Sequence, residues 1–112
     1  MKPVLLLVSA PKGPAGRRLA RALVEERLAA CVTAVPGAAS VYRWKGRVER
    51  TAEELLFIKS ARPRLPALFR RIKALHPYDV PEILVWPVAG GNADYLAWLG
   101  AAVAASGRAR IR

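Results

Sequence analysis

Sulfur and imidazole are scarce in this chain of 112 residues, which has one cysteine and one histidine. The lone Cys31 excludes an intramolecular disulfide framework and a zinc site of the CxxC type. Such a chain fits a reducing compartment, so we expect a cytoplasmic protein. No apolar segment is long enough to span a membrane. The short apolar run at residues 4–8 has no cleavage pattern after it, so a buried strand explains it better than a signal peptide does.

Acidic residues are also few, with 8 Asp and Glu against 19 Lys and Arg, and the formal net charge is +11. The basic residues gather in three clusters, at residues 17–21, 62–73 and 108–112. This balance is typical of proteins that bind nucleic acid, anionic surfaces or acidic small molecules. However, aromatic residues are not interleaved with the clusters, and no RNP, KH or zinc-finger pattern is present. We therefore expect a solvated basic surface, with neither nucleic acid nor a membrane as partner.

Catalytic motifs are missing as well. The four serines Ser9, Ser40, Ser60 and Ser106 have one histidine to share, and no G-x-S-x-G elbow surrounds any of them. No Walker or Rossmann glycine pattern occurs, and the Gly90-Gly91 pair is too short to indicate phosphate binding. We do not expect an enzyme.

The apolar residues that are present predict a single α+β domain over residues 1–112, which is long enough to bury one core. In chain order we expect a strand at 4–9, a helix at 14–28, a strand at 31–44 that is broken or bulged at Pro36-Gly37, a strand from Arg47 through 55–58, a helix at about 64–75, a strand at 82–88, and a last helix capped by Asn92. This βαββαβ order with an extra C-terminal helix is that of the ferredoxin-like sandwich.

The second and third predicted strands form an unusually long hairpin, because Lys45-Gly46 offers a two-residue turn between them. Such a hairpin extends beyond a four-stranded core, and Tyr42 and Trp44 share one of its faces. Exposed aromatic residues on a strand with an unpaired edge favour pairing with another chain. We therefore expect an oligomer in which hairpins pair between subunits.

The segment from His76 to Glu82 is the most specific local feature of the chain. Pro77 should end a helix at His76, and Pro81 should keep its neighbour extended until a strand begins near Glu82. The corner holds an imidazole, the phenol of Tyr78 and two carboxylates, so it is either a site or a rigid joint. His76 could bind copper or zinc. Alternatively, it could donate hydrogen bonds to the last carbonyls of the helix.

Together these residues resemble the CutA family of divalent-cation tolerance proteins, over nearly the whole chain from Ser9 to about Leu99. The matching segments are 23–31 (LVEERLAAC), Pro36-Gly37 with 40–46 (SVYRWKG), Ile58-Lys59, 75–82 (LHPYDVPE) and 94–98 (DYLAW). The resemblance implies a tight homotrimer similar to the PII signalling proteins, with hairpins paired between subunits. It also implies a role in the response to copper and other divalent ions.

The candidate metal ligands are His76, Cys31 and Glu82. Some relatives carry a cysteine in place of Val8 and a second histidine in place of Leu75, so two soft ligands are missing here. We therefore expect copper or another divalent cation to bind weakly. Alternatively, Cys31 binds no metal and only fills space in the core as a small buried apolar residue.

The candidate cleft residues are Tyr42, Trp44, Lys59, Tyr78 and Glu82, which we expect at a subunit boundary unless the aromatic residues only pack. A buried ion pair between Lys59 and Glu82, at the ends of neighbouring strands, would line this cleft. Such a cleft favours a second function, that of a PII-like sensor of a small anionic ligand. A third alternative is a scaffold trimer whose basic surface contacts polyanions.

Overall fold

The computed structural model describes residues 2–104, and the basic residues expected at 108–112 lie outside that range. The elements in chain order are β1 (Pro3–Pro11), α1 (Ala15–Glu25), β2 (Cys31–Trp44), β3 (Arg47–Ala61), the 3-10 helix η1 (Arg62–Arg64), α2 (Leu65–Leu75), β4 (Ile83–Pro87) and α3 (Ala93–Ala102). This order confirms the predicted α+β class and the ferredoxin-like βαββαβ arrangement with an extra C-terminal helix.

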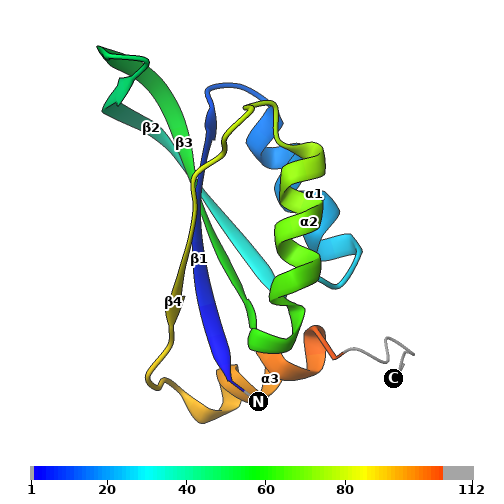
Figure 1. Ribbon diagram of the computed structural model, residues 1–112. Coiled ribbons are helices and arrows are strands. Elements are labelled where there is room, and N and C mark those ends of the chain that lie inside the picture. Colours follow the sequence, from blue (N-terminus) through cyan, green and yellow to red (C-terminus); the bar gives the residue numbers. More distant parts are fainter. Residues whose placement is uncertain (1, 105–112) are drawn as a thin grey trace.

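The four strands form one antiparallel sheet in the order β2-β3-β1-β4. The helices α1 and α2 lie side by side on one face of the sheet, and α3 lies near the end of the sheet where β1 begins (Figure 1). No helix among residues 2–104 is long and apolar enough to cross a membrane.

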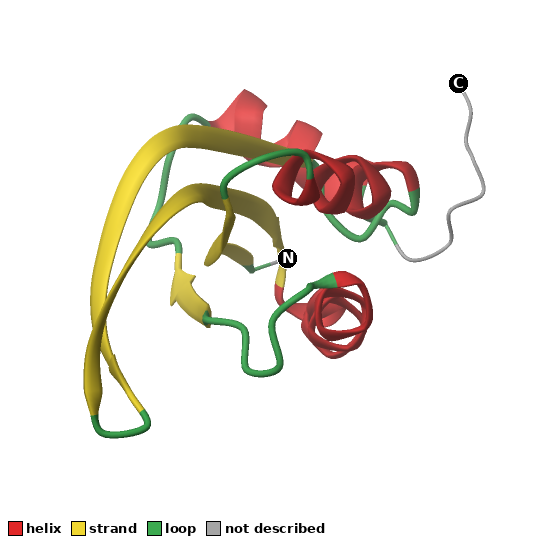
Figure 2. Cartoon of the chain, turned by 90° about the horizontal axis from the view of Figure 1, so that it is seen from above, coloured by secondary structure: helices red, strands yellow, loops and turns green. Residues whose placement is uncertain are grey.

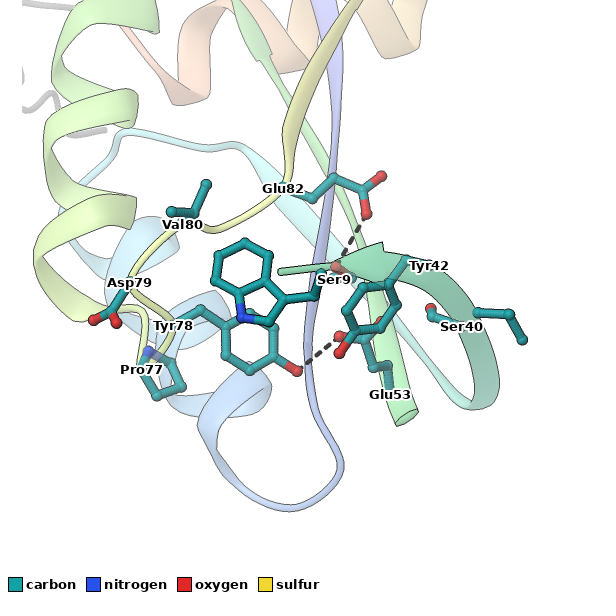
Figure 3. A pocket seen from close by; sticks show the side chains of 11 residues that line it. Ser9, Ser40, Tyr42, Glu53, Pro77, Tyr78, Asp79, Val80 and Glu82 are labelled. Carbon is teal, nitrogen blue, oxygen red and sulfur yellow. Dashed lines mark hydrogen bonds between the residues drawn. The ribbon is translucent and has the colours of Figure 1, made fainter. Parts of the chain in front are cut away.

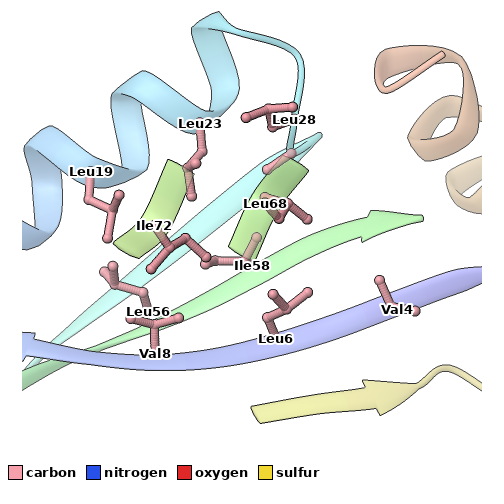
Figure 4. Packing of buried hydrophobic residues seen from close by; sticks show 11 residues of the cluster. Val4, Leu6, Val8, Leu19, Leu23, Leu28, Leu56, Ile58, Leu68 and Ile72 are labelled. Atoms are coloured by element: carbon pink, nitrogen blue, oxygen red, sulfur yellow. The ribbon is translucent and has the colours of Figure 1, made fainter. Parts of the chain in front are cut away.

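The core lies between the sheet and the pair of helices (Figure 4). Alternate residues of β1 point into it, since Val4, Leu6 and Val8 are at most 1% exposed. The remaining buried members of this core come from α1, α2, β3 and the turn after α1: Leu19, Leu23, Leu28, Ala29, Leu56, Ile58, Leu68 and Ile72. A smaller cluster, Ala30, Ala61, Leu99 and Val103, fixes α3.

The strands β2 and β3 continue past the end of β1 as a two-stranded ribbon (Figures 1 and 2). Figure 2 shows them curving together away from the helices to the turn at Lys45-Gly46, where both residues have positive φ. The ribbon makes the protomer elongated, with extents of 50 × 26 × 23 Å. The predicted long hairpin is therefore confirmed.

Local signals placed most element ends correctly. The Asn92 side chain accepts hydrogen bonds from the backbone N–H groups of Asp94 and Tyr95, as an N-cap should. Helix α2 ends at Leu75, and His76 is already extended before Pro77. Helix α1 ends three residues earlier than predicted, because Arg27 adopts a left-handed conformation with φ of 61°.

Candidate functional site

A β-bulge decides which side chains of the ribbon face the rest of the protein. Val35 pairs with Leu55, whereas Ala38 pairs with Glu53, so Pro36-Gly37 adds one residue to β2. Gly37 takes a φ of 84°, a conformation that favours glycine. The extra residue reverses the alternation of β2. As a result Tyr42 and Trp44 of β2 lie on the same sheet face as Glu53 of β3, the face that points away from α1 and α2.

A pocket of about 700 Å³ opens at the base of the ribbon, between the ribbon and the loop that follows α2 (Figure 3). Its lining residues come from β1, β2, β3 and that loop: Ser9, Ser40, Val41, Tyr42, Trp44, Glu53, Pro77, Tyr78, Asp79, Val80 and Glu82. The volume lies in the range of small-molecule sites. Four of the five predicted cleft residues line it, namely Tyr42, Trp44, Tyr78 and Glu82.

The charge of the pocket is opposite to the charge of the chain. Glu53, Asp79 and Glu82 line it, and no lysine or arginine does so in the part of the chain that the structure describes. Glu82 accepts a hydrogen bond of 3.1 Å from the Ser9 hydroxyl. Each of these charges lies on a different part of the wall (Figure 3). The pocket therefore has the electrostatic character of a cation site rather than of the expected anion site.

Glu53 is the most enclosed of the three carboxylates, with an exposed fraction of 6%. The Tyr78 hydroxyl donates a 2.7 Å hydrogen bond to its Oε2 atom (Figure 3). Burial, together with the hydrogen bond to Glu53 and the negative charge of that residue, raises the pKa of Tyr78 well above its ordinary range. Tyr78 thus remains a hydrogen-bond donor throughout the neutral pH range.

His76 fixes the corner between α2 and β4. It is 7% exposed, its Nε2 lies 2.7 Å from the Ser9 carbonyl oxygen, and its Nδ1 accepts a hydrogen bond from the Tyr78 backbone N–H. The acceptor role of Nδ1 requires the tautomer in which Nε2 carries the proton and donates it to Ser9. Because both nitrogens have partners, His76 in this conformation has no lone pair free for a metal. The partners are the backbones of Ser9 and Tyr78 rather than the last helical carbonyls.

Cys31 lies far from this corner. Cys31 pairs in register with Lys59, and Lys59 pairs in turn with Leu5 of β1. His76 instead contacts Ser9, which lies four residues further along β1. Four residues of an extended strand span about 13 Å, so the two side chains lie at different levels of the sheet. The thiol is partly buried, and its Sγ lies 3.6 Å from the Lys59 ammonium. Within one protomer, then, the three predicted metal ligands are not brought together.

The expected ion pair between Lys59 and Glu82 is wrong within the protomer. Lys59 donates to the Thr33 hydroxyl and lines no part of the pocket, while Glu82 accepts from Ser9. Lys59 lies on β3 and Glu82 directly before β4, and β1 separates these two strands. Lys59 pairs with Leu5 of β1, whereas Glu82 contacts Ser9, four residues further along that strand. The prediction failed because it assumed that β3 and β4 are neighbours.

Glu53 and Ser9 were missed as site residues. Glu53 could have been found from the alternation of β3. It lies two residues before Leu55 and four before Phe57, so all three side chains share one face of the strand. Ser9 could have been found from the same alternation in β1, but its contact with Glu82 joins residues 73 positions apart.

These features define a ferredoxin-like α+β protein with a projecting ribbon and an acidic pocket lined by aromatic residues at the base of the ribbon. Residues 4–102 match the model of the family described as CutA1 divalent ion tolerance protein. This match spans most of the chain, and the chain belongs to the CutA1 family.

Individual relatives agree with that assignment. The chain is 52% identical over 95 residues to the divalent-cation tolerance protein CutA of Thermus thermophilus, covering 85% of this chain and 92% of that protein. It is 49% identical to the protein of the same description from Pectobacterium atrosepticum, covering 89% and 91%. The crystal structure of CutA1 from Oryza sativa superposes with a TM-score of 0.89 at 47% identity, covering 91% of this chain and 94% of that one.

Proposed function

We propose that this protein takes part in the response to divalent cations, as a homotrimer that binds copper or another divalent cation weakly. The observation that carries the proposal is the pocket at the base of the ribbon, where three of the chain's eight acidic residues lie on different parts of the wall and no basic residue lines it among residues 2–104. Family membership supports the same role.

We propose that Glu53, Asp79 and Glu82, rather than His76 and Cys31, attract the ion as separate carboxylates, because among residues 2–104 no three His, Cys, Asp or Glu side chains are grouped closely enough to hold a metal ion together. Carboxylate oxygens bind hard and borderline divalent ions, including Cu(II), whereas soft ligands would be needed for tight binding of Cu(I). The imidazole of His76 is occupied by two backbone groups, and the Cys31 thiol faces an ammonium group. Both observations favour weak binding through oxygen.

The trimer is supported by apolar surface on the sheet face that points away from α1 and α2. Leu84 and Trp86 of β4 are half exposed there, and β2 has an unpaired edge in the protomer. A single chain rarely leaves so much apolar surface and an open strand edge in water. A cytoplasmic location and the lack of an enzymatic activity stay predictions from the sequence.

Calorimetric titration with Cu(II) tests the ligand set. We expect the double substitution Glu53→Gln and Glu82→Gln to weaken binding by about tenfold or more, because it removes two anionic ligands. The substitution Glu54→Gln is the matched control, since Glu54 is equally buried but faces the helices and pairs with Arg17. His76→Gln, whose side-chain amide can still donate to the Ser9 carbonyl, should leave the affinity unchanged. If His76→Gln abolished binding in a protein of unchanged thermal midpoint and the double substitution did not, the carboxylate ligand set would be wrong.

A further inference from the structure

The outer surface of the layer formed by α1 and α2 is strongly basic. Residues 15–26 and 62–75, which include both helices, contain eight arginine and lysine residues but only two acidic residues, Glu25 and Glu26. The apolar side of both helices is buried against the sheet (Figure 4), so the charged side chains collect on the side that faces solvent. Eight residues form this basic helix surface: Arg17, Arg18, Arg21, Arg62, Arg64, Arg70, Arg71 and Lys73.

Part of this positive charge is not neutralised within the protomer. Three ion pairs involve the surface: Arg17 with Glu54, Arg21 with Glu25, and Arg71 with Glu26. Both acidic residues of the two segments are used in these pairs. Arg18, Arg70 and Lys73 are exposed on the helices and take part in no ion pair among residues 2–104. Arg70 and Lys73 are three positions apart and share one face of α2, and α1 with Arg18 lies beside that helix (Figure 1).

The composition of the basic helix surface indicates what kind of polyanion fits. Seven of its eight residues are arginines, whose guanidinium groups can bind two phosphate oxygens at once. The one aromatic residue of the two segments, Phe69, is partly buried. Single-stranded nucleic acids are held largely by stacking on aromatic side chains, and helices that bind membrane surfaces insert tryptophan or phenylalanine. The lack of exposed aromatic rings therefore counts against single strands and membranes, but not against the backbone of a duplex, which exposed cations bind without stacking.

We propose that the basic helix surface docks on the phosphate backbone of double-stranded nucleic acid, through Arg18, Arg70 and Lys73 and without reading the base sequence. The duplex approaches from the helix side, because the opposite sheet face carries the acidic pocket, which repels phosphate groups. Assembly through the open sheet face leaves the helices outside, so the surface stays accessible. This interaction goes beyond the response to divalent cations and uses none of the pocket residues.

The test is fluorescence anisotropy of a labelled DNA duplex of about 20 base pairs, titrated with the full-length protein at about 50 mM salt. We expect a Kd of about 100 μM or tighter, equal within about twofold for two duplexes of unrelated sequence, because the contacts are to the backbone. With three phosphate contacts, the logarithm of the binding constant should fall against the logarithm of the salt concentration with a slope of about −3.

The triple substitution Arg18→Gln, Arg70→Gln and Lys73→Gln should weaken duplex binding by about tenfold or more, because it removes all three contacts. It should also flatten the salt dependence, since fewer counterions are then released from the duplex. Cu(II) titration of the same variant should match wild type, so the failure of either proposal leaves the other intact.

The matched control is the triple substitution Arg43→Gln, Arg47→Gln and Arg50→Gln on the ribbon. These three arginines are also exposed and also outside every ion pair of residues 2–104. The control removes the same charge from a different surface, so it should weaken duplex binding by less than about threefold. The elution volume and the thermal midpoint of each variant check its fold.

Three results would overturn this inference: no change in anisotropy at about 1 mM protein, an affinity that does not fall with added salt, or an equal loss of binding in the two triple variants. Two further probes separate the duplex from other polyanions, namely a single strand of the same length and phosphatidylcholine vesicles with about one-third phosphatidylserine. Both should bind more weakly than the duplex. Tighter binding of either one would make the duplex the wrong partner for this surface.

Discussion

At the scale of single residues, two neighbouring glutamates of β3 differ in everything except burial. Glu54 faces the helices, where its Oε2 pairs with Arg17 and its Oε1 is buried without a partner among residues 2–104. Glu53 faces the pocket, where its Oε2 accepts a hydrogen bond from the Tyr78 hydroxyl. The alternation of a strand places them on opposite faces, so consecutive residues of one type acquire unrelated roles. Glu54 contributes to the packing of α1 on the sheet, and Glu53 contributes a charge to the pocket.

The contact between Tyr78 and Glu53 predicts a measurable pH dependence. The pKa of Tyr78 is raised in the folded protein relative to its ordinary value of about 10, so the folded state holds this proton more tightly than the unfolded state does. Its contribution to stability is complete below pH of about 10 and is lost as the pH rises further, because the unfolded phenol ionises first. Absorbance titration of phenolate should show one tyrosine that ionises late.

Two substitutions check this assignment. Tyr78→Phe should remove the late-ionising group altogether. Glu53→Gln should lower the pKa of Tyr78 but leave it above the ordinary value, since the carboxylate is removed while the burial, which is the largest cause, remains. An unchanged late phase in Tyr78→Phe would assign that phase to another tyrosine.

At the scale of elements, the bulge in β2 sets the composition of the pocket. If every residue of β2 alternated regularly through Pro36-Gly37, with no bulge, Ala39, Val41 and Arg43 would face the pocket side in place of Ser40, Tyr42 and Trp44. The bulge therefore keeps the aromatic rings of the ribbon, rather than an arginine, on that face.

Deleting Gly37 should remove the bulge but keep the aromatic wall, because Val35 and Ala38 then stand two positions apart, as their partners Leu55 and Glu53 do. In wild type the Tyr42 hydroxyl lies 2.9 Å from the Thr51 hydroxyl, so the two side chains should give an NMR cross-relaxation signal. We expect the deletion variant to retain this signal. Gly37→Asn is the control, because it keeps the residue count and asparagine tolerates positive φ at a cost of about 1 kcal/mol. Loss of the Tyr42–Thr51 signal in the deletion variant alone would contradict the predicted register.

At the scale of the whole molecule, the protomer has two unlike layers. The helix layer carries many of the basic residues and buries the core, while the opposite sheet face leaves large apolar side chains half exposed. The ribbon and its pocket extend from the end of the sheet where β1 finishes. This arrangement favours assembly through the open sheet face and the ribbon, with the helices outside.

Assembly can be tested by introducing a charged side chain on that open sheet face. We expect wild type to elute with the mass of three 12.2 kDa chains, and Trp86→Glu to shift the protein toward smaller species because a buried, unpaired carboxylate is unfavourable at an interface. Val24→Glu is the control, since Val24 is 40% exposed on α1, on the opposite layer. Light scattering coupled to gel filtration measures both. A monomeric wild type, or equal loss of assembly in both variants, would contradict the proposed trimer.

The sequence by itself determined the elements and the family. Periodicity located the strands and helices, the residues Pro77, Lys45-Gly46 and Asn92 marked where elements stop, turn and start, and Pro36-Gly37 marked the bulge. These features depend on neighbours within a few positions, so they can be seen without knowledge of the fold. The four aromatic and acidic pocket residues were found in the same way, as members of the ribbon and the corner.

Only the tertiary structure decided how the charges are paired. It placed β1 between β3 and β4, which separates Lys59 from Glu82. It also brought the two ring nitrogens of His76 within hydrogen-bond distance of the backbones of Ser9 and Tyr78. It also paired Glu54 with Arg17 and placed Glu53 beside the Tyr78 hydroxyl. Such pairings depend on strand order and register between segments tens of residues apart, which no local pattern encodes.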